Sequence, residues 1–463
     1  MAISRRNFLK GLGSGAVGAA SFLAGADRLF QMNARADAVS EGDYKALVCV
    51  FLYGGNDANN TVIPYADGEY EAYRVARESL AFGREALLPL SPSSGAPDYS
   101  LHPALTGLQS LWGDGKLAIL ANVGPLVRPF SSREEFVDRS IPAPYQLFSH
   151  SDQQAAWQSS QATGSATTGW GGRLAVYSRS PGDRLPNSIG INDSDLFGTG
   201  AGLSPLVIPS APSDISRALT LNHPDDQVPN STYRRMIENA GGRDAPTLVR
   251  AVSRIMAQAL ETTMELSVNP TITQPFSGSN LGNQLLQVAK LINFSREAGI
   301  RRQVFLCSLG GFDTHTSQGT TWGPHAGLMQ ELGTALAEFY LATQELELAD
   351  RITTFTMSDF GRTLKPNGEW GAAGTDHAWG GHHFILGDAV RGRELYGSFP
   401  RMLLGDGDDA DSGSDARGRW IPTTSVDQYA ATLARWFGVA DSDMATLFPN
   451  LKNFSTPDLG FML

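Results

Sequence analysis

The sequence predicts an α/β fold with a mainly parallel central sheet and helices on both of its faces. Three observations support this prediction. Strand patterns alternate with helix patterns along the chain, most strand patterns are nearly continuous apolar runs, and Gly-Gly or an aspartate follows several of them. Continuous apolar runs are typical of strands buried on both faces, and a β-α-β succession places parallel strands side by side with helices across them.

Strands are expected at "ALVCVFLYGG" (46–55), "KLAILANVG" (116–124), "RQVFLCSLGGFD" (302–313), "RITTFTMSDFG" (351–361) and "HFILGD" (383–388). Apolar residues at helical spacing predict helices over 104–115, 326–346 and 425–439, the last with a capping residue at its start and Gly at its end. The region 140–260 is less regular, and we expect it to be an elaborated insertion or cap.

The N-terminus has the pattern of a twin-arginine export signal. "SRRNFLK" (4–10) is followed by a weakly apolar run over 11–25 and by the small-x-small pattern Ala36-Asp37-Ala38. The run is shorter than the roughly 20 residues needed to span a bilayer, so a cleaved signal (residues 1–38) is expected rather than a stable membrane anchor. The mature chain, 39–463, is then periplasmic or secreted, and its export partners are the twin-arginine translocase and signal peptidase.

The charge balance excludes one class of partner. The formal net charge is -11, and removing residues 1–38, with five basic and two acidic residues, makes it -14. Such an acidic chain argues against nucleic acid or an anionic membrane as a partner. Cys49 and Cys307 both lie in predicted strands. Oxidation after export would allow a disulfide, but two buried thiols in separate strands are the better interpretation.

Metal-competent side chains follow several of the predicted strands. In open parallel sheets, ligands bind beyond the carboxyl ends of the strands. The candidates at these ends are Asp57, Asp313, His315, Asp359, Asp376 and His377. Oxygen and imidazole ligands suit Zn²⁺, Mn²⁺, Mg²⁺ or Ca²⁺, and two such ions close together clamp a phosphate or sulfate ester. We therefore expect a site for one or two divalent ions.

Seven segments, taken in order, resemble a known family. They are "FLYGGNDANNTVIPY", "LHPAL", "FSHSDQQAAWQ", "GGFDTHTSQ", "SDFGRTLKPN", "GTDHAWGG…FILGDAVRG" and "VDQYAATLARWFG". The sequence resembles the domain of unknown function 1501 family, bacterial exported proteins of the alkaline phosphatase and sulfatase superfamily, over nearly all of the mature chain. The resemblance implies an alkaline-phosphatase-like α/β/α sandwich and a metal-dependent hydrolase of phosphate or related esters.

The resemblance also implies roles for individual residues. Asp57 resembles the carboxylate that opens the second metal site, and Asp359 resembles another carboxylate of that site. Asp313 and His315 resemble ligands of the first metal, which His377 completes.

The implied nucleophile is Ser149, at the start of a predicted helix whose free N–H groups favour an anion. The alternative interpretation is that Ser149 or Ser151 caps this helix. Thr61 is a weaker candidate nucleophile, and His150 is either an acid–base group or a partner of a loop carbonyl. No cysteine lies in the C/S-x-P-x-R context from which sulfatases form formylglycine, so that route is not expected.

A second registration remains open around "GTDHAWGGHH" (374–383). It makes Asp376-His377 the metal-binding pair and His382 or His383 the late histidine. In the favoured registration Asp376 contacts the His377 ring without binding the metal itself, and His382 is only an alternative ligand.

The remaining candidates have equally plausible structural roles. His325 either reaches the Asp313 loop or packs at the start of its helix, and Arg362 either contacts an oxyanion or forms an ion pair. Phe360 stands where the superfamily's metal-binding members have histidine. This departure favours the rival hypothesis of a non-catalytic binding or assembly protein with a degenerate metal site.

Overall fold

The structure is a computed structural model that describes residues 44–93, 98–180, 186–215 and 270–463, together with the single positions 235, 239, 242, 246, 249 and 253. The predicted signal segment 1–38 therefore lies outside the described residues. Within them, no helix has both the length and the apolar character needed to cross a membrane.

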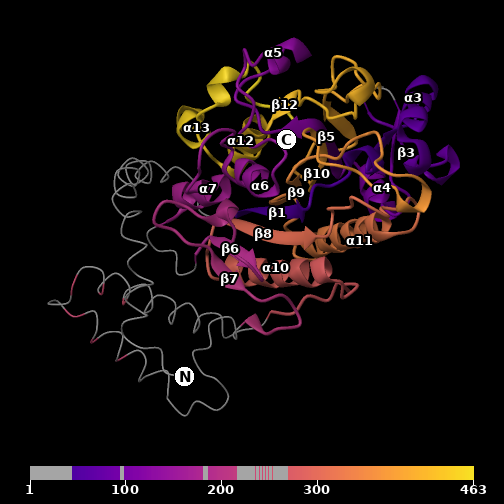
Figure 1. Cartoon of the computed structure of the whole chain (residues 1–463). Coiled ribbons are helices and arrows are strands. Elements are labelled where there is room, and N and C mark those ends of the chain that lie inside the picture. Colours follow the sequence, from indigo (N-terminus) through magenta and orange to yellow (C-terminus); the bar gives the residue numbers. More distant parts are fainter. Residues whose placement is uncertain are drawn as a thin grey trace, which may run out of the picture.

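A nine-stranded sheet forms the centre of the molecule (Figure 1). Its order is β11-β5-β10-β9-β1-β8-β6-β7, with β12 beside β5. The strands are β1 (Lys45–Tyr53), β5 (Leu117–Gly124), β6 (Ser188–Ile191), β7 (Leu206–Ile208), β8 (Arg302–Gly310), β9 (Ile352–Ser358), β10 (Gly381–Leu386), β11 (Glu394–Gly397) and β12 (Thr424–Ser425). Every pairing is parallel except those of β10 with β5 and β9. The predicted α/β class with a mainly parallel sheet is thus confirmed.

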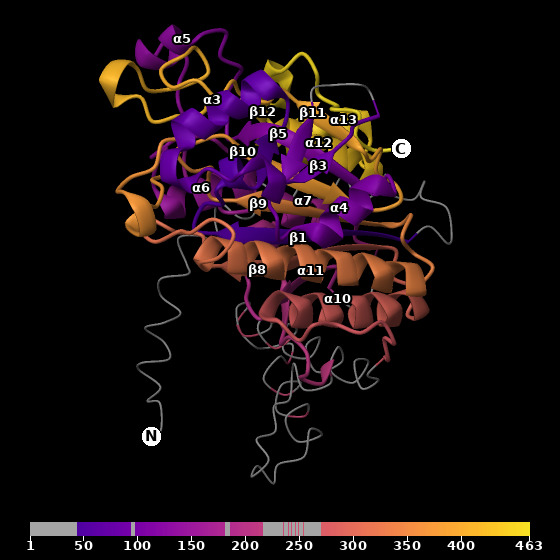
Figure 2. The same cartoon turned by 90° about the vertical axis from the view of Figure 1, so that its right-hand side faces the viewer.

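Helices cover both faces of this sheet. They are α3 (Asp67–Arg77), α4 (Thr106–Gly113), α5 (Arg133–Val137), α6 (His150–Ser159), α7 (Trp170–Ser178), α10 (Asn280–Glu297), α11 (Pro324–Glu345), α12 (Val426–Phe437) and α13 (Asp441–Leu447). Helices α4, α10 and α11 pack on one face, and α7, α12 and α13 pack on the other. Figure 2 shows α10 and α11 lying side by side along the first of these faces.

Shorter elements complete the fold. A small antiparallel sheet has the order β2-β4-β3, with β2 (Val62–Pro64), β3 (Leu88–Leu90) and β4 (Tyr99–Leu101). The 3-10 turns are η2 (Ala58–Asn60), η3 (Glu78–Leu80), η4 (Arg84–Ala86), η5 (Leu196–Gly198), η7 (Trp370–Ala372), η8 (Gly413–Asp415) and η9 (Leu451–Asn453).

Strand β1 shows why the strand patterns are nearly continuous apolar runs. Alternate residues of a strand point to opposite faces of its sheet. Ala46, Val48, Val50 and Leu52 enter the core under α10 and α11, whereas Leu47, Cys49 and Phe51 enter the core under α7 and α12. Both faces of β1 are therefore buried, as the sequence predicts.

The two cysteines are free and buried, which confirms the prediction of core thiols. Cys49 lies in the core on the α12 face of the sheet, whereas Cys307 lies in the core on the α10 face. Because the sheet separates the two side chains, they do not form a disulfide.

The predicted helices correspond to α4, α11 and α12. In α12 the hydroxyl of Ser425 accepts a hydrogen bond from Gln428 N, and the Gln428 side chain accepts one from Ser425 N, which is a capping box. Gly438 ends this helix in the left-handed conformation, with φ of 117°.

The described part of the predicted insertion, 140–260, is continuous with the main body. It contributes β6 and β7 to one edge of the large sheet, α7 packs against β6, and α6 packs against α7 and η5. Helix α6 also contacts β9, which brings its N-terminus toward the strand ends near the centre of the sheet.

Candidate metal centre

Four side chains from three separate segments meet beyond the ends of β8 and β9. Asp313 and His315 follow β8, His377 precedes β10, and His150 is the first residue of α6. Asp313 Oδ1 lies 3.0 Å from His315 Nε2, 3.4 Å from His377 Nε2 and 3.5 Å from His150 Nε2. The Nε2 atoms of His315 and His377 are 3.0 Å apart. We call these four residues the histidine–aspartate cluster.

These separations suit the ligands of one metal ion. Zn²⁺ binds histidine nitrogen and carboxylate oxygen at about 2.0–2.2 Å, so tetrahedral ligand atoms lie roughly 3.3 Å apart. The ligand atoms of His150, Asp313 and His377 all lie within 4.8 Å of one another. The donor set of the cluster therefore fits a single divalent ion of the Zn²⁺ type.

The outer nitrogen of each histidine ring is held by an oxygen atom. The three pairs are His150 Nδ1 with Asp359 Oδ2 at 2.6 Å, His315 Nδ1 with Asp376 Oδ1 at 3.1 Å, and His377 Nδ1 with the Phe148 carbonyl at 2.8 Å. An oxygen acceptor at Nδ1 keeps the proton on that nitrogen and leaves Nε2 as the unprotonated ligand atom. All three Nε2 atoms face Asp313, and with the proton on Nδ1 each of them would present its lone pair to an ion bound beside Asp313.

Arg362 lies beneath Asp313 and fixes its position. The Arg362 side chain is fully buried, forms an ion pair with Asp313, and donates to the carbonyls of Gly54, Gly55 (3.0 Å) and Thr375 (2.9 Å). Partial burial raises the pKa of the Asp313 carboxyl, but the hydrogen bond and charge of Arg362 outweigh this effect and lower it overall. Of the two predicted roles for Arg362, the structure supports the ion pair.

Asp376 supports His315, not His377 as expected. Its other hydrogen bonds come from Asn367 at 2.7 Å and Arg417 at 2.8 Å. Burial alone would raise the pKa of Asp376, but the hydrogen bonds from Asn367 and His315 and the charge of Arg417 lower it overall. Asp376 is therefore a carboxylate that can hold the His315 ring in a fixed orientation.

Asp359 lies behind His150 rather than at a second metal. The side chain is fully buried and accepts hydrogen bonds from the Gly54 amide at 3.2 Å and from Gln154 at 2.9 Å, in addition to its contact with His150. Its nearest imidazole thus belongs to the histidine–aspartate cluster. This corrects the expectation that Asp359 is a ligand of a separate ion.

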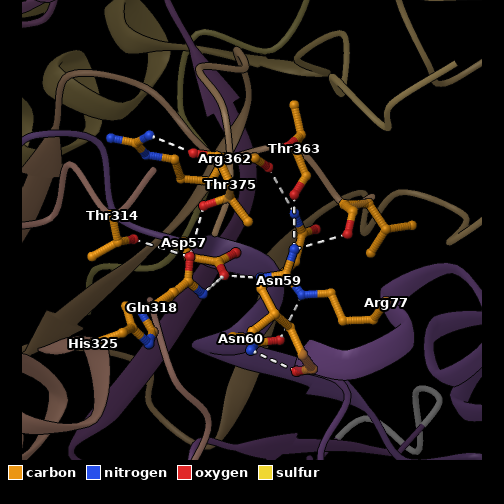
Figure 3. Close-up of polar contacts among 12 residues, drawn as sticks. Asp57, Asn59, Asn60, Arg77, Thr314, Gln318, His325, Arg362, Thr363 and Thr375 are labelled. Carbon is orange, nitrogen blue, oxygen red and sulfur yellow. Dashed lines mark hydrogen bonds and ion pairs between the residues drawn. The ribbon is translucent and has the colours of Figure 1, made fainter. Parts of the chain in front are cut away.

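Asp57 pairs with an arginine side chain and not with a metal ligand set. Figure 3 shows its carboxylate inside a buried polar network, in contact with Arg77 and Gln318. Gln318 in turn accepts hydrogen bonds from Thr314 at 3.0 Å and Thr375 at 2.7 Å. Asp57 and Arg77 are both fully buried, so the guanidinium compensates the carboxylate charge. The expected metal ligand Asp57 is instead one half of an internal ion pair.

The other histidines proposed as possible ligands lie elsewhere. His325 is buried beside Asn56, 3.3 Å from its Oδ1, and burial lowers its pKa well below the usual value. His382 and His383 are buried in β10, where His382 Nδ1 accepts from the Asn122 amide at 3.1 Å and His383 Nδ1 lies 3.3 Å from Thr356 Oγ1. Because β10 holds both rings inside the fold, the structure does not bring the late histidine of the second registration, His382 or His383, to the cluster.

Ser149 occupies the N-cap position of α6, directly before His150. Its hydroxyl donates to Asp152 Oδ2 at 2.6 Å and lies 3.2 Å from the Ser151 hydroxyl, while its side chain makes no capping bond to the helix backbone. The structure therefore places the expected nucleophile next to the cluster in the chain, with a carboxylate as its proton acceptor.

Phe360 is an apolar residue that lies beside the cluster. Its ring is buried, 4.8 Å from the His150 ring centroid and 4.6 Å from that of His377. It packs against two of the ligand rings instead of binding a metal itself. His150 was expected to be an acid–base group or a partner of a loop carbonyl, and the structure brings it into the cluster as a candidate ligand.

The structure thus contains an α/β protein with a candidate centre for one metal ion. Residues 225–415 match the family described as "Protein of unknown function (DUF1501)", which confirms the resemblance over that segment. The matched segment contains Asp313, His315 and His377, whereas His150 lies before it. A search of curated proteins finds no match.

Two solved structures show a weak likeness to this chain. The structure of Ps i-CgsB in complex with k-i-k-neocarrahexaose has 11% identity and a TM-score of 0.33, and the alignment covers 90% of this chain and 77% of that one. The PsFucS1 sulfatase from Pseudoalteromonas sp. has 10% identity and a TM-score of 0.33, covering 90% of this chain and 71% of its own. At these TM-scores the likeness carries no argument about activity.

Proposed function

We propose that this protein is an exported, metal-dependent hydrolase of phosphate or related esters. One divalent ion would be held by His150, Asp313, His315 and His377. The observation that carries the proposal is the convergence of three Nε2 atoms on Asp313 Oδ1, while an oxygen acceptor holds each Nδ1. Export rests on the N-terminal twin-arginine pattern, and the ester class rests on the family resemblance.

The proposal is for one ion, because the residues expected at a second site already have partners. Asp57 pairs with Arg77, and Asp359 accepts hydrogen bonds from Gln154 and the Gly54 amide and contacts His150. A second ion near Asp57 would face the buried positive charge of Arg77.

Solvent exposure favours a catalytic role over a structural one. The side chain of Asp313 is 48% exposed, that of His315 is 41% exposed and that of His150 is 31% exposed. Structural zinc sites are closed by their protein ligands, whereas catalytic sites keep a position for water or substrate. With all four residues of the cluster bound to the ion, a catalytic role would use a fifth position on the exposed side. A bound ion supplies a Lewis acid that polarises an ester oxygen and lowers the pKa of water.

The N-terminus of α6 favours an anionic substrate. This helix has ten residues, and the N–H groups of its first turn have no acceptor within the helix. Such N–H groups attract the oxygens of phosphate or sulfate. Ser149, at the N-cap, remains the proposed nucleophile, and Asp152 is the group that would take its proton. Cys49 and Cys307 are both buried, so neither is placed to become a formylglycine nucleophile.

Metal analysis of the mature protein tests the proposal. We expect about one equivalent of Zn²⁺ or Mn²⁺, lost in His315→Ala and Asp313→Asn. Asp67→Asn is the control, because its exposed carboxylate on α3 lies outside the cluster. Metal-dependent release of nitrophenol from nitrophenyl phosphate, a phosphodiester or a sulfate, lost in the same variants, would establish hydrolysis. A folded protein that takes up no metal would refute the proposal.

The rival proposal is a non-catalytic exported binding or assembly protein with a degenerate metal site. The presence of Arg77 against Asp57 and of Phe360 beside the cluster favours it. Full metal occupancy without hydrolysis of any of the three esters would support this rival.

A further inference from the structure

A cleft of about 260 Å³ opens beside the histidine–aspartate cluster. One wall comes from α6, with Gln154 and Gln158, and another comes from Tyr53 at the end of β1. Asp193 and Asp195, between β6 and η5, form a third wall. The cleft therefore lies between the central strands and the segment that the sequence assigns to an insertion.

The cleft is linked to the cluster through Asp359. Gln154 lines the cleft and donates to Asp359, which holds the His150 ring. Tyr53 lines the cleft directly before Gly54, whose amide also donates to Asp359. Asp359 therefore connects the α6 wall of the cleft to the His150 ring of the cluster.

The cleft has a negative lining without a compensating cation. Asp193 and Asp195 are its only charged residues, and its other polar groups are hydroxyls and amides. Within the described part of the chain, neither aspartate forms an ion pair. Asp195 accepts a hydrogen bond from the Tyr53 hydroxyl, and Gln158 donates to that same hydroxyl at 3.1 Å. Gln158 also accepts from the Phe197 amide at 3.0 Å, so these contacts fix the orientation of the Tyr53–Asp195 pair.

We propose that this cleft binds an ammonium group on the alcohol part of the substrate. The inference rests on the proposed function and names the substrate class: esters of amino alcohols. An ammonium group donates hydrogen bonds to carboxylates and compensates their charge, and the face of an aromatic ring such as Tyr53 also attracts cations. A neutral hydroxyl group at the same place would leave the carboxylate charge uncompensated. In the reaction, Ser149 Oγ would bond to phosphorus as the bond between phosphorus and the alcohol oxygen breaks, and the serine proton would pass through Asp152 to the departing alcohol. Water would then replace the serine oxygen on phosphorus and return a proton to Ser149.

A matched pair of substrates tests this inference. Phosphoethanolamine and 2-hydroxyethyl phosphate differ in the group that would enter the cleft, which is an ammonium in one and a hydroxyl in the other. With the metal-loaded protein, we expect kcat/KM for phosphate release to favour phosphoethanolamine by about tenfold, which corresponds to about 1.4 kcal/mol. The double variant Asp193→Asn/Asp195→Asn should lose this preference, so that its kcat/KM values for the two esters become equal. Asp193→Asn alone, at an exposed position, should lose part of it.

Calorimetry of ethanolamine binding gives a second readout that does not depend on hydrolysis. The wild type should bind ethanolamine, ethylene glycol should not bind, and the double variant should bind neither. Asp67→Asn is again the control for charge. Equal kcat/KM for the two esters, or a preference that persists in the double variant, would overturn the inference. If neither ester is hydrolysed, the proposed function fails. In that case ethanolamine binding that is lost in the double variant still supports the cation site, and its absence refutes that site.

Discussion

At the scale of single residues, the orientation of the cluster's side chains depends on the groups that contact them on the side away from the centre of the cluster. His150, His315 and His377 each have an oxygen acceptor at Nδ1, and Asp313 has Arg362. The sequence located Asp313, His315 and His377 because they lie next to predicted strands. It did not separate ligands from supporting carboxylates, because an aspartate after a strand has the same pattern in both roles. Asp359 and Asp376 are distinguished from Asp313 only by which ring nitrogen they face.

Asp376→Asn should weaken metal binding without unfolding the protein. Removing the carboxylate charge behind His315 lowers the basicity of that ligand, and such changes cost about 10–100-fold in metal affinity. The Kd is measured by competition with a chromophoric chelator. Arg417→Met is the matched control, since it removes the ion pair of Asp376 but leaves the contact with His315. An equal loss of affinity in both variants would show that the role of Asp376 is not specific to His315.

At the scale of elements, the sequence was most reliable where local pattern and tertiary environment agree. The continuous apolar runs of β1, β8 and β9 correspond to strands covered on both faces. Helix α10 was missed, although its apolar residues Leu281, Leu285, Val288 and Ile292 follow a helical spacing and are buried. The direction of β10 was also beyond prediction, because periodicity does not distinguish a parallel strand from an antiparallel one. Its antiparallel course places His382 and His383 inside the sheet.

The buried histidines of β10 should make the fold sensitive to acid. Burial lowers the pKa of His383 to about 3, from an ordinary value of 6.5. Between these values the unfolded chain binds a proton that the folded chain does not, so stability falls as pH decreases below about 6.5. Each such group contributes roughly 1.4 kcal/mol per pH unit. Asp427, whose pKa burial raises to about 7, has the opposite dependence, so the contribution of His383 is isolated by comparing variants.

His383→Gln is the variant for this comparison. Urea unfolding at pH 7.5 and pH 5 should show a smaller loss of stability in the variant than in the wild type. His383 also packs against Trp157 at 4.6 Å between ring centroids, so the variant is expected to be less stable at both values. Comparing how much the free energy of unfolding changes between pH 7.5 and pH 5 in each protein removes this constant effect. An unchanged pH dependence would mean that His383 binds a proton equally well in the folded and unfolded states.

The ion pair between Asp57 and Arg77 joins the loop after β1 to the end of α3. Arg77→Met should destabilise the fold by about 3–5 kcal/mol, because it leaves the Asp57 carboxylate buried without a cation. Arg77 also donates to the Thr363 and Leu364 carbonyls, each at 2.8 Å, and these acceptors would lose a partner as well. Urea denaturation measures the change. Asp57→Asn combined with Arg77→Met should recover part of the loss, and no recovery would show that the carbonyl contacts outweigh the charge.

At the scale of the whole molecule, the candidate centre links segments that are far apart in the sequence. His150 comes from α6, Asp313 and His315 follow β8, and His377 precedes β10. The sequence predicted that strand ends would converge, because parallel strands share one edge. The position of α6 could not be predicted in this way, because it depends on contacts of this helix with β9 and η5. For this reason His150 was not recognised as a ligand from its local pattern.

A metal that joins these segments should stabilise the whole fold. Binding to the folded state alone adds about 2.7 kcal/mol when free Zn²⁺ is at 100 times its Kd, which raises Tm by a few degrees. Differential scanning calorimetry with and without chelator measures this shift. His315→Ala should retain the metal-free Tm under both conditions, whereas Asp67→Asn should respond like the wild type. If Zn²⁺ raises the Tm of His315→Ala as much as that of the wild type, the ion binds outside the cluster. Because the shift depends on binding and not on turnover, the result shows whether the cluster binds a metal ion before any substrate is known.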